Sequence, residues 1–121
     1  MKKKTKKKVI KQTKLLPTEL FEQQMEAAGI PSYVKEHKFL AKRRFRFDFA
    51  WVDLKLAFEL EGGVWTRGRH TSPIGYTRDC EKYNLAAIDG WTVLRATSGQ
   101  VSEGKAIEWL IMYLNTKGFN L

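Results

Sequence analysis

The spacing of apolar residues along the chain changes from a helical to an alternating pattern. Apolar residues three and four positions apart predict an amphipathic helix over residues 18–26, and Gly29 followed by Pro31 ends it. We expect a first strand over residues 33–39. Over residues 44–51 aromatic and polar residues alternate strictly, as in a strand with one buried face. The alternation assigns four aromatic side chains to that face: Phe45, Phe47, Phe49 and Trp51.

The rest of the chain repeats this change of period. After a turn at residues 52–53 a second alternation runs over residues 54–61, with Glu59 and Glu61 on one side. Gly62 and Gly63 end that strand. The remaining pattern predicts four segments: a polar loop over 64–75, a helix over 76–88, a short internal strand over 91–95 and an amphipathic helix over 101–115.

The order of these elements is helix, three strands, helix, strand, helix. Two strands joined by a tight turn pair as an antiparallel hairpin, whereas a strand that follows a crossover helix pairs in parallel. The fold class is therefore α/β, a mixed β-sheet flanked by α-helices. A chain of 121 residues, of which 43% are hydrophobic, is long enough for one domain with a real core.

Charge is distributed unevenly along the chain. Eight of the 22 Lys and Arg residues lie within the first 14 residues, where there is no acid, and the other 14 face 13 acids. We therefore expect residues 1–16 to be a basic disordered tail and residues 17–121 to be the folded domain. Such a tail either solubilises the protein or strengthens binding to a polyanion by releasing counterions.

A few absences narrow the class of protein. One cysteine excludes a disulfide scaffold, and there is no apolar run of membrane-spanning length and no signal-peptide pattern. We expect a cytoplasmic protein. Within the domain a second basic cluster is interleaved with phenylalanines in a strand-like pattern, which fixes its charges on one surface: Lys35, Lys38, Lys42, Arg43, Arg44 and Arg46.

Three acids fall on the two strands of the predicted hairpin. Asp48 lies on the face opposite the aromatic row, and the turn near residues 52–53 brings it close to Glu59. Glu61, two residues later, points the same way as Glu59. Carboxylates grouped in this way repel one another unless a cation lies between them, and Mg²⁺ prefers oxygen ligands. The alternative is a solvated sheet surface that carries three acids. Helices on both faces of the sheet, and the glycines directly after Glu61, favour a site.

Several stretches together resemble the PD-(D/E)XK nuclease superfamily, which has the restriction-endonuclease-like fold. Within it the chain is most similar to the very-short-patch-repair-like endonucleases and their small phage and bacterial relatives. The resemblance covers roughly residues 17–115. It rests on seven stretches in order: ELF at 19–21, AAG at 27–29, RFRFDFAW at 44–51, KLAFELEGG at 55–63, GRH at 68–70, DCEKYN at 79–84 and GWTVLR at 90–95.

The resemblance implies roles for individual residues. Asp48 and Glu59 match the metal ligands, with Mg²⁺ as the cofactor and Mn²⁺ as a substitute. Glu19 matches the acid that the family carries on its first helix, and Glu22 is the fallback. Where the superfamily has a lysine two residues after the second ligand, this chain has Glu61. That acid either adds a ligand or orients the attacking water.

The missing lysine leaves its role to another cation. The candidates are Lys82, Arg78 and His70, and we count Lys82 and His70 among the catalytic residues together with Glu19, Asp48, Glu59 and Glu61. For His70 the alternative is simple exposure in a polar loop. The DNA-binding residues expected from the basic stretches are Lys42, Arg43, Arg44, Arg46, Arg67 and Arg69.

We therefore expect a metal-dependent DNA endonuclease that hydrolyses phosphodiester bonds. Its small size leaves no room for a separate recognition domain, so a DNA structure such as a nick, branch, mismatch or junction is the expected target. A homodimer would supply two cuts. The alternatives are a non-catalytic DNA-binding module on the same fold, a nuclease acting on RNA, and a basic interaction protein.

Deletion of residues 2–14 tests the role of the tail. The variant should fold and keep its chemistry, but it should bind DNA more weakly and with a flatter salt dependence. Log K falls with log salt by about 0.9 for each duplex phosphate neutralised, and as many as eight lysines are removed. Fluorescence anisotropy at several salt concentrations measures this slope. Equal slopes for the two proteins would show that the tail does not touch DNA.

Overall fold

The computed structural model describes residues 15–62 and 73–121. Within these ranges no helix is both long and apolar enough to cross a membrane. The elements in chain order are α2 (Pro17–Ala27), β1 (Val34–Lys38), β2 (Arg46–Trp51), the short 3-10 helix η1 (Val52–Leu54), β3 (Leu56–Glu61), α3 (Pro73–Ile88), β4 (Thr92–Thr97), α4 (Ser98–Ser102) and α5 (Lys105–Thr116).

The strands form one mixed sheet in the order β1-β2-β3-β4. β2 pairs antiparallel with both β1 and β3, whereas β4 pairs parallel to β3 after the crossover through α3. The predicted mixed sheet is confirmed. The prediction that β4 is internal is wrong, because β4 ends the sheet that the described residues form. Its Val93 and Leu94 are covered by the helical layers on the two faces.

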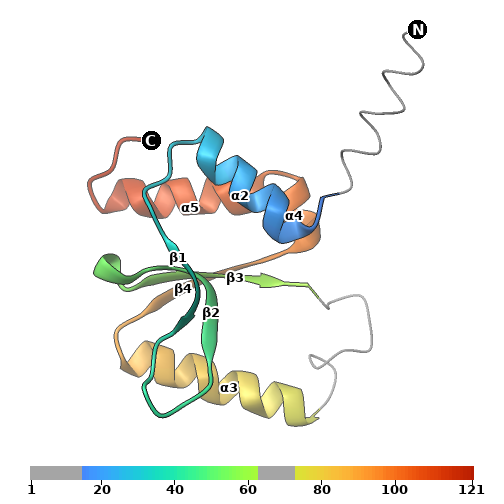
Figure 1. Cartoon of the computed structure of the whole chain (residues 1–121), viewed down its shortest axis with the longest axis vertical. Coiled ribbons are helices and arrows are strands. Elements are labelled where there is room, and N and C mark those ends of the chain that lie inside the picture. The colour runs from blue at the N-terminus through green and yellow to red at the C-terminus, as the bar shows by residue number, and fades with distance from the viewer. Residues whose placement is uncertain (1–14, 63–72) are drawn as a thin grey trace, which may run out of the picture.

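Helices cover both faces of the sheet, as Figure 1 shows, with α2, α4 and α5 on one face and α3 on the other. The larger core lies under α2, α4 and α5. Phe21 of α2 packs there on Phe58 and Phe49, with ring centroids 4.7 and 5.5 Å apart. Leu110 and Leu114 of α5 are fully buried in the same cluster.

The smaller core, under α3, contains a residue that the alternation assigned to the other face. Phe47 is buried beside Trp91, at 4.9 Å, while Phe49 and Trp51 face the larger core. Phe45 lies before β2 begins. The prediction of one aromatic row is therefore wrong at Phe47. Between Phe47 and Phe49 the pairing with β1 is interrupted: the register passes from Lys35–Phe49 to His37–Phe47, and Glu36 between them has φ +53.

The C-terminal helix is interrupted. The apolar spacing predicted one helix over 101–115, but the structure has α4 and α5 separated at Gly104. Gly104 has φ +83, a left-handed conformation that favours glycine, and it is the residue before α5 begins. The break lets Val101 and Leu110 both reach the larger core.

Phe58→Ala tests how much the packing of Phe58 against Phe21 stabilises the larger core. Phe58 is fully buried, so truncation should lower the free energy of unfolding by about 3–5 kcal/mol. Ile88→Ala is the control, because Ile88 is 81% exposed and its loss should change stability by less than about 0.5 kcal/mol. Urea denaturation of both variants measures the difference. Equal losses would contradict this description of the core.

Candidate active site

Two carboxylates take backbone hydrogen bonds across the β2–β3 pair. The backbone pairing runs from Trp51–Leu56 to Phe49–Phe58, and one step further along the same register Asp48 faces Glu59. There the N–H of Asp48 donates to Glu59 Oε2 at 2.8 Å, and the N–H of Leu60 donates to Asp48 Oδ2 at 2.8 Å. The two carboxylates thus accept hydrogen bonds from backbone N–H groups, and each carboxylate is fixed by the opposite strand.

Both carboxyl groups lie where burial disfavours their charge. Glu59 is 5% exposed and Asp48 is half-buried. Burial raises the pKa of Asp48, and the hydrogen bond from Leu60 only partly offsets this effect. Burial also raises the pKa of Glu59, against the opposing effect of the Lys82 ammonium. A further cation near the pair would therefore stabilise both carboxylates.

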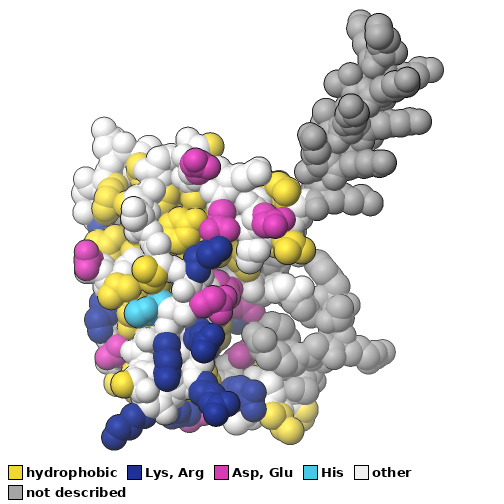
Figure 2. All heavy atoms as spheres, in the orientation of Figure 1, with side chains coloured by type: hydrophobic (Ala, Val, Ile, Leu, Met, Phe, Trp, Pro, Cys, Tyr) yellow, Lys and Arg dark blue, Asp and Glu magenta, His cyan; other side chains and the backbone are white. Residues whose placement is uncertain are grey.

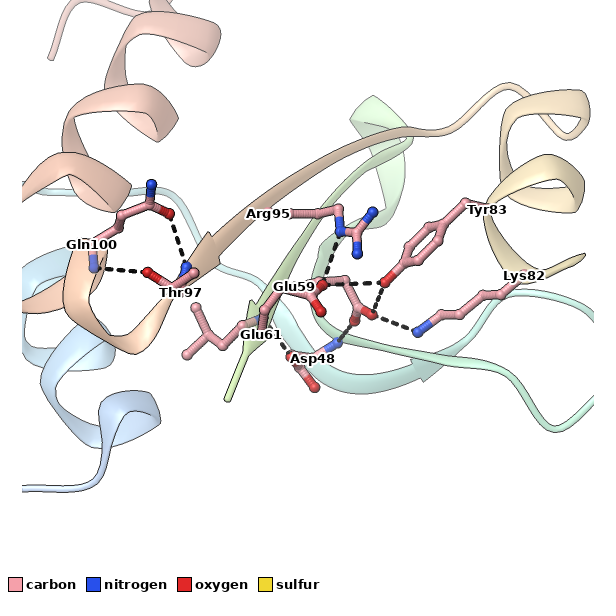
Figure 3. Close-up of polar contacts among 9 residues, drawn as sticks. Asp48, Glu59, Glu61, Lys82, Tyr83, Arg95, Thr97 and Gln100 are labelled. Carbon is pink, nitrogen blue, oxygen red and sulfur yellow. Dashed lines mark hydrogen bonds and ion pairs between the residues drawn. The ribbon is translucent and has the colours of Figure 1, made fainter. Parts of the chain in front are cut away.

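Helix α3 brings two polar side chains to the same carboxylate, as Figure 3 shows. Lys82 Nζ lies 2.5 Å from Glu59 Oε1, and both side chains are largely buried, at 13% and 6% exposure. The Tyr83 hydroxyl donates to the same Oε1 at 2.9 Å and lies 3.5 Å from Glu61 Oε2. Burial and the neighbouring Glu59 and Glu61 raise the pKa of Tyr83, so its hydroxyl stays a hydrogen-bond donor.

Glu61 is paired with a cation from the neighbouring parallel strand. Arg95 Nε donates to Glu61 Oε2 at 2.9 Å, and the guanidinium lies 4.4 Å from the centre of the Tyr83 ring. A continuous polar chain results, from Lys82 through Glu59, Tyr83 and Glu61 to Arg95 (Figure 3). The sequence did not predict Tyr83 or Arg95. The available signal was a basic residue at the end of an otherwise apolar strand.

The structure does not bring the two acids of the first helix into this chain of contacts. Glu19 is exposed, and its carboxylate accepts a hydrogen bond from the Leu16 N–H at the start of α2. Glu22 accepts one from the Tyr33 hydroxyl and pairs with Lys35. The reason is that α2 covers one face of the sheet, while Glu59 contacts α3 on the other. A catalytic role for Glu19 stays a prediction.

The predicted basic residues divide into two groups. Lys42, Arg44 and Arg46 are exposed, and Arg43 forms an ion pair with Glu81 of α3. Figure 2 shows Lys and Arg side chains grouped at the end of the molecule that carries α3 and the β1–β2 connection. Arg78 is exposed on α3. The remaining predicted residues, His70, Arg67 and Arg69, lie outside the described residues.

The Asp48–Glu59 pair has the donor chemistry of a Mg²⁺ site. Within residues 15–62 and 73–121 no three His, Cys, Asp or Glu side chains are grouped closely enough to hold an ion. A pair of carboxylates is nevertheless a usual protein contribution for Mg²⁺, because water and substrate phosphate oxygens complete its octahedral shell. Oxygen donors whose charge is disfavoured by burial are compatible with this ion.

Comparison with known proteins bears on the fold. No protein-family model matches the chain, and neither does the sequence of any curated protein. A solved structure that the chain resembles is the catalytic domain of the homing endonuclease I-Bth0305I, with a TM-score of 0.65 over 88% of this chain and 99% of that one. At 16% identity this likeness shows a shared fold. The expected α/β architecture is confirmed, and membership of the PD-(D/E)XK superfamily stays a prediction.

Lys82→Met tests the buried ion pair. Removal of the ammonium leaves the Glu59 carboxylate buried without its cation, which should cost about 3 kcal/mol of folding free energy in EDTA at neutral pH. The double variant Lys82→Met/Glu59→Gln should recover a large part of the loss, because a neutral amide needs no counter-charge. Urea denaturation gives these free energies.

The control is Lys35→Met, which breaks the exposed ion pair with Glu22 and should cost less than about 1 kcal/mol. If Lys82→Met is no more destabilising than this control, the Lys82–Glu59 pair does not hold α3 against β3.

Proposed function

We propose that this domain is a metal-dependent DNA endonuclease that hydrolyses phosphodiester bonds. The observation that supports it best is the Asp48–Glu59 pair. Asp48 is half-buried and Glu59 is buried, and each carboxylate is fixed by a backbone hydrogen bond from the opposite strand. The likeness to a homing endonuclease catalytic domain adds support at the level of the fold. Basic side chains on the neighbouring surface suit a polyanionic substrate.

In this proposal Asp48 and Glu59 hold Mg²⁺, or Mn²⁺ in its place. When bound, such an ion polarises a phosphate oxygen and lowers the pKa of a water molecule. Hydrolysis joins the water oxygen to phosphorus and breaks one phosphorus–oxygen ester bond. The proton of the water passes to a base, and the departing oxygen takes up a proton. The chain contributes fixed carboxylate oxygens, so little reorganisation is needed as charge develops.

In this proposal Lys82 takes over the role that the superfamily gives to a lysine two residues after the second metal ligand. Its ammonium lies 2.5 Å from Glu59 Oε1, although it belongs to α3 and is 23 residues further along the chain. A buried ammonium beside the carboxylates can stabilise the negative charge of the phosphate during cleavage. Glu61 then has another task, since its Oε2 accepts the hydrogen bond from Arg95.

The DNA surface of the proposal is the basic cluster of the β1–β2 connection. Lys42 and Arg44 are exposed there, Arg46 is exposed at the start of β2, and the Arg43–Glu81 ion pair joins the connection to α3. Contacts of this kind reach phosphates and carry no sequence information. They are compatible with a target defined by DNA structure, such as a nick, a mismatch or a branch.

Asp48→Asn and Glu59→Gln should each reduce single-turnover cleavage by at least about 100-fold, because an amide is a poor ligand for a hard cation. Binding to the same DNA in EDTA should be unchanged or tighter, since a charge that repels phosphate is removed. The substrates are linear, nicked, mismatched and four-way-branched DNAs and an RNA duplex, each incubated with Mg²⁺, Mn²⁺ or EDTA.

Asp53→Asn is the matched control. Asp53 lies on η1, at the opposite end of the same two strands, and is exposed, so this variant should cleave like the wild type. Metal-dependent cleavage that survives in purified Asp48→Asn or Glu59→Gln would contradict the assignment of Asp48 and Glu59 as the metal ligands. Binding without cleavage of any substrate by the wild type would favour a non-catalytic DNA-binding module. Preferential cleavage of the RNA duplex would show that RNA, and not DNA, is the substrate.

A further inference from the structure

Two adjoining hollows lie between α3 and the end strand of the sheet, and both are lined by Tyr83 and Arg95. One, of about 380 Å³, also has Tyr76, Asp79 and Asn84 in its wall. The other, of about 260 Å³, is closed by Trp91 and Val93. Arg95 is the one basic residue among the described residues that line them, so an anion that enters either hollow meets its guanidinium.

The Arg95 side chain is held in place from two directions. Its Nε donates to Glu61 Oε2 at 2.9 Å, and its guanidinium lies over the Tyr83 ring, 4.4 Å from the centroid. The terminal nitrogens make no hydrogen bond to any described residue, and the side chain is 44% exposed. An arginine whose Nε is already bound presents its two remaining amino groups in one direction.

This arrangement differs from that of an ordinary surface ion pair. The Glu61 side chain is 10% exposed and Arg95 is far more open, so the buried partner anchors the exposed one. A guanidinium fixed in this way loses little conformational entropy when it binds an anion. Phosphate oxygens are the acceptors that match its paired N–H groups. Among the described residues, hydrogen bonds link Arg95 to the carboxylate of Glu59 through Glu61 and Tyr83.

We propose that Arg95 binds a backbone phosphate of the nucleic acid, with Glu61 and Tyr83 as the residues that position its guanidinium. The inference rests on the proposed nuclease function and specifies where the strand runs, along the α3–β4 hollows, whose Tyr83 also donates to Glu59. The inference also gives a role to Glu61, which stands where the superfamily has a lysine. The acid orients a phosphate-binding arginine, while Lys82 provides the cation at the carboxylate pair.

The experiment compares Arg95→Gln with wild type in EDTA, where no cleavage is needed. Fluorescence anisotropy with a fluorescent duplex DNA over a series of KCl concentrations gives the slope of log K against log salt. Loss of one phosphate contact should flatten the slope by about 0.9. Lys117→Gln is the matched control, because Lys117, directly after α5, also lies over a tyrosine, Tyr113, and α5 covers the other face of the sheet. Its slope should equal that of the wild type.

Arg95→Lys keeps the charge and covers the case in which Arg95→Gln fails to fold. A single ammonium cannot pair with Glu61 and also present a planar fork, so affinity should fall several-fold while the slope is retained. An unchanged slope in a folded Arg95→Gln, or wild-type affinity in Arg95→Lys, overturns the proposal. A flattened slope in a protein that cleaves no substrate keeps the phosphate site and removes the hydrolytic function.

Discussion

The exchange of hydrogen bonds between Asp48 and Glu59 is the interaction on which the candidate site depends. In a regular antiparallel pair the hydrogen bonds between the strands join backbone N–H groups to backbone carbonyls. Here the N–H groups of Asp48 and Leu60 bond to carboxylates instead. The exchange fixes the two acids from within the sheet, next to the point where Phe47 packs in the core under α3.

Helix α3 completes the site because the buried carboxylate of Glu59 requires a counter-charge. Lys82 provides it, and the adjacent Tyr83 extends the contact to Glu61. A buried ion pair adds little net stability because desolvation of its charges is costly, but removal of one partner leaves the other charge buried without compensation. The packing of α3 on the sheet and the charge balance at Glu59 therefore depend on the same contacts, those of Lys82 and Tyr83. A change in the position of α3 would disturb the contacts of Lys82 and Tyr83 with Glu59 before it disturbed the larger core.

Periodicity was sufficient to predict what depends on local burial, namely the helices, the β2–β3 hairpin and the approach of Asp48 to Glu59. It was wrong at Phe47, which packs under α3 beside the position where the β1–β2 pairing is interrupted at Glu36, a residue with φ +53. The break at Gly104 lies within a run of helical spacing, and only the glycine signals it. Arg95 was missed because its partner depends on the register of a parallel strand, which a crossover sets and local pattern does not.

The central claim is that the Asp48–Glu59 pair binds a divalent cation. Anomalous diffraction from crystals soaked in Mn²⁺ tests it most directly. We expect an anomalous peak within coordination distance of carboxylate oxygens of both residues in the wild type, and no peak there in Asp48→Asn. In Asp53→Asn the peak should be unchanged. A wild-type crystal whose Mn²⁺ peaks all lie away from Asp48 and Glu59, or a peak that persists between them in Asp48→Asn, would contradict the claim.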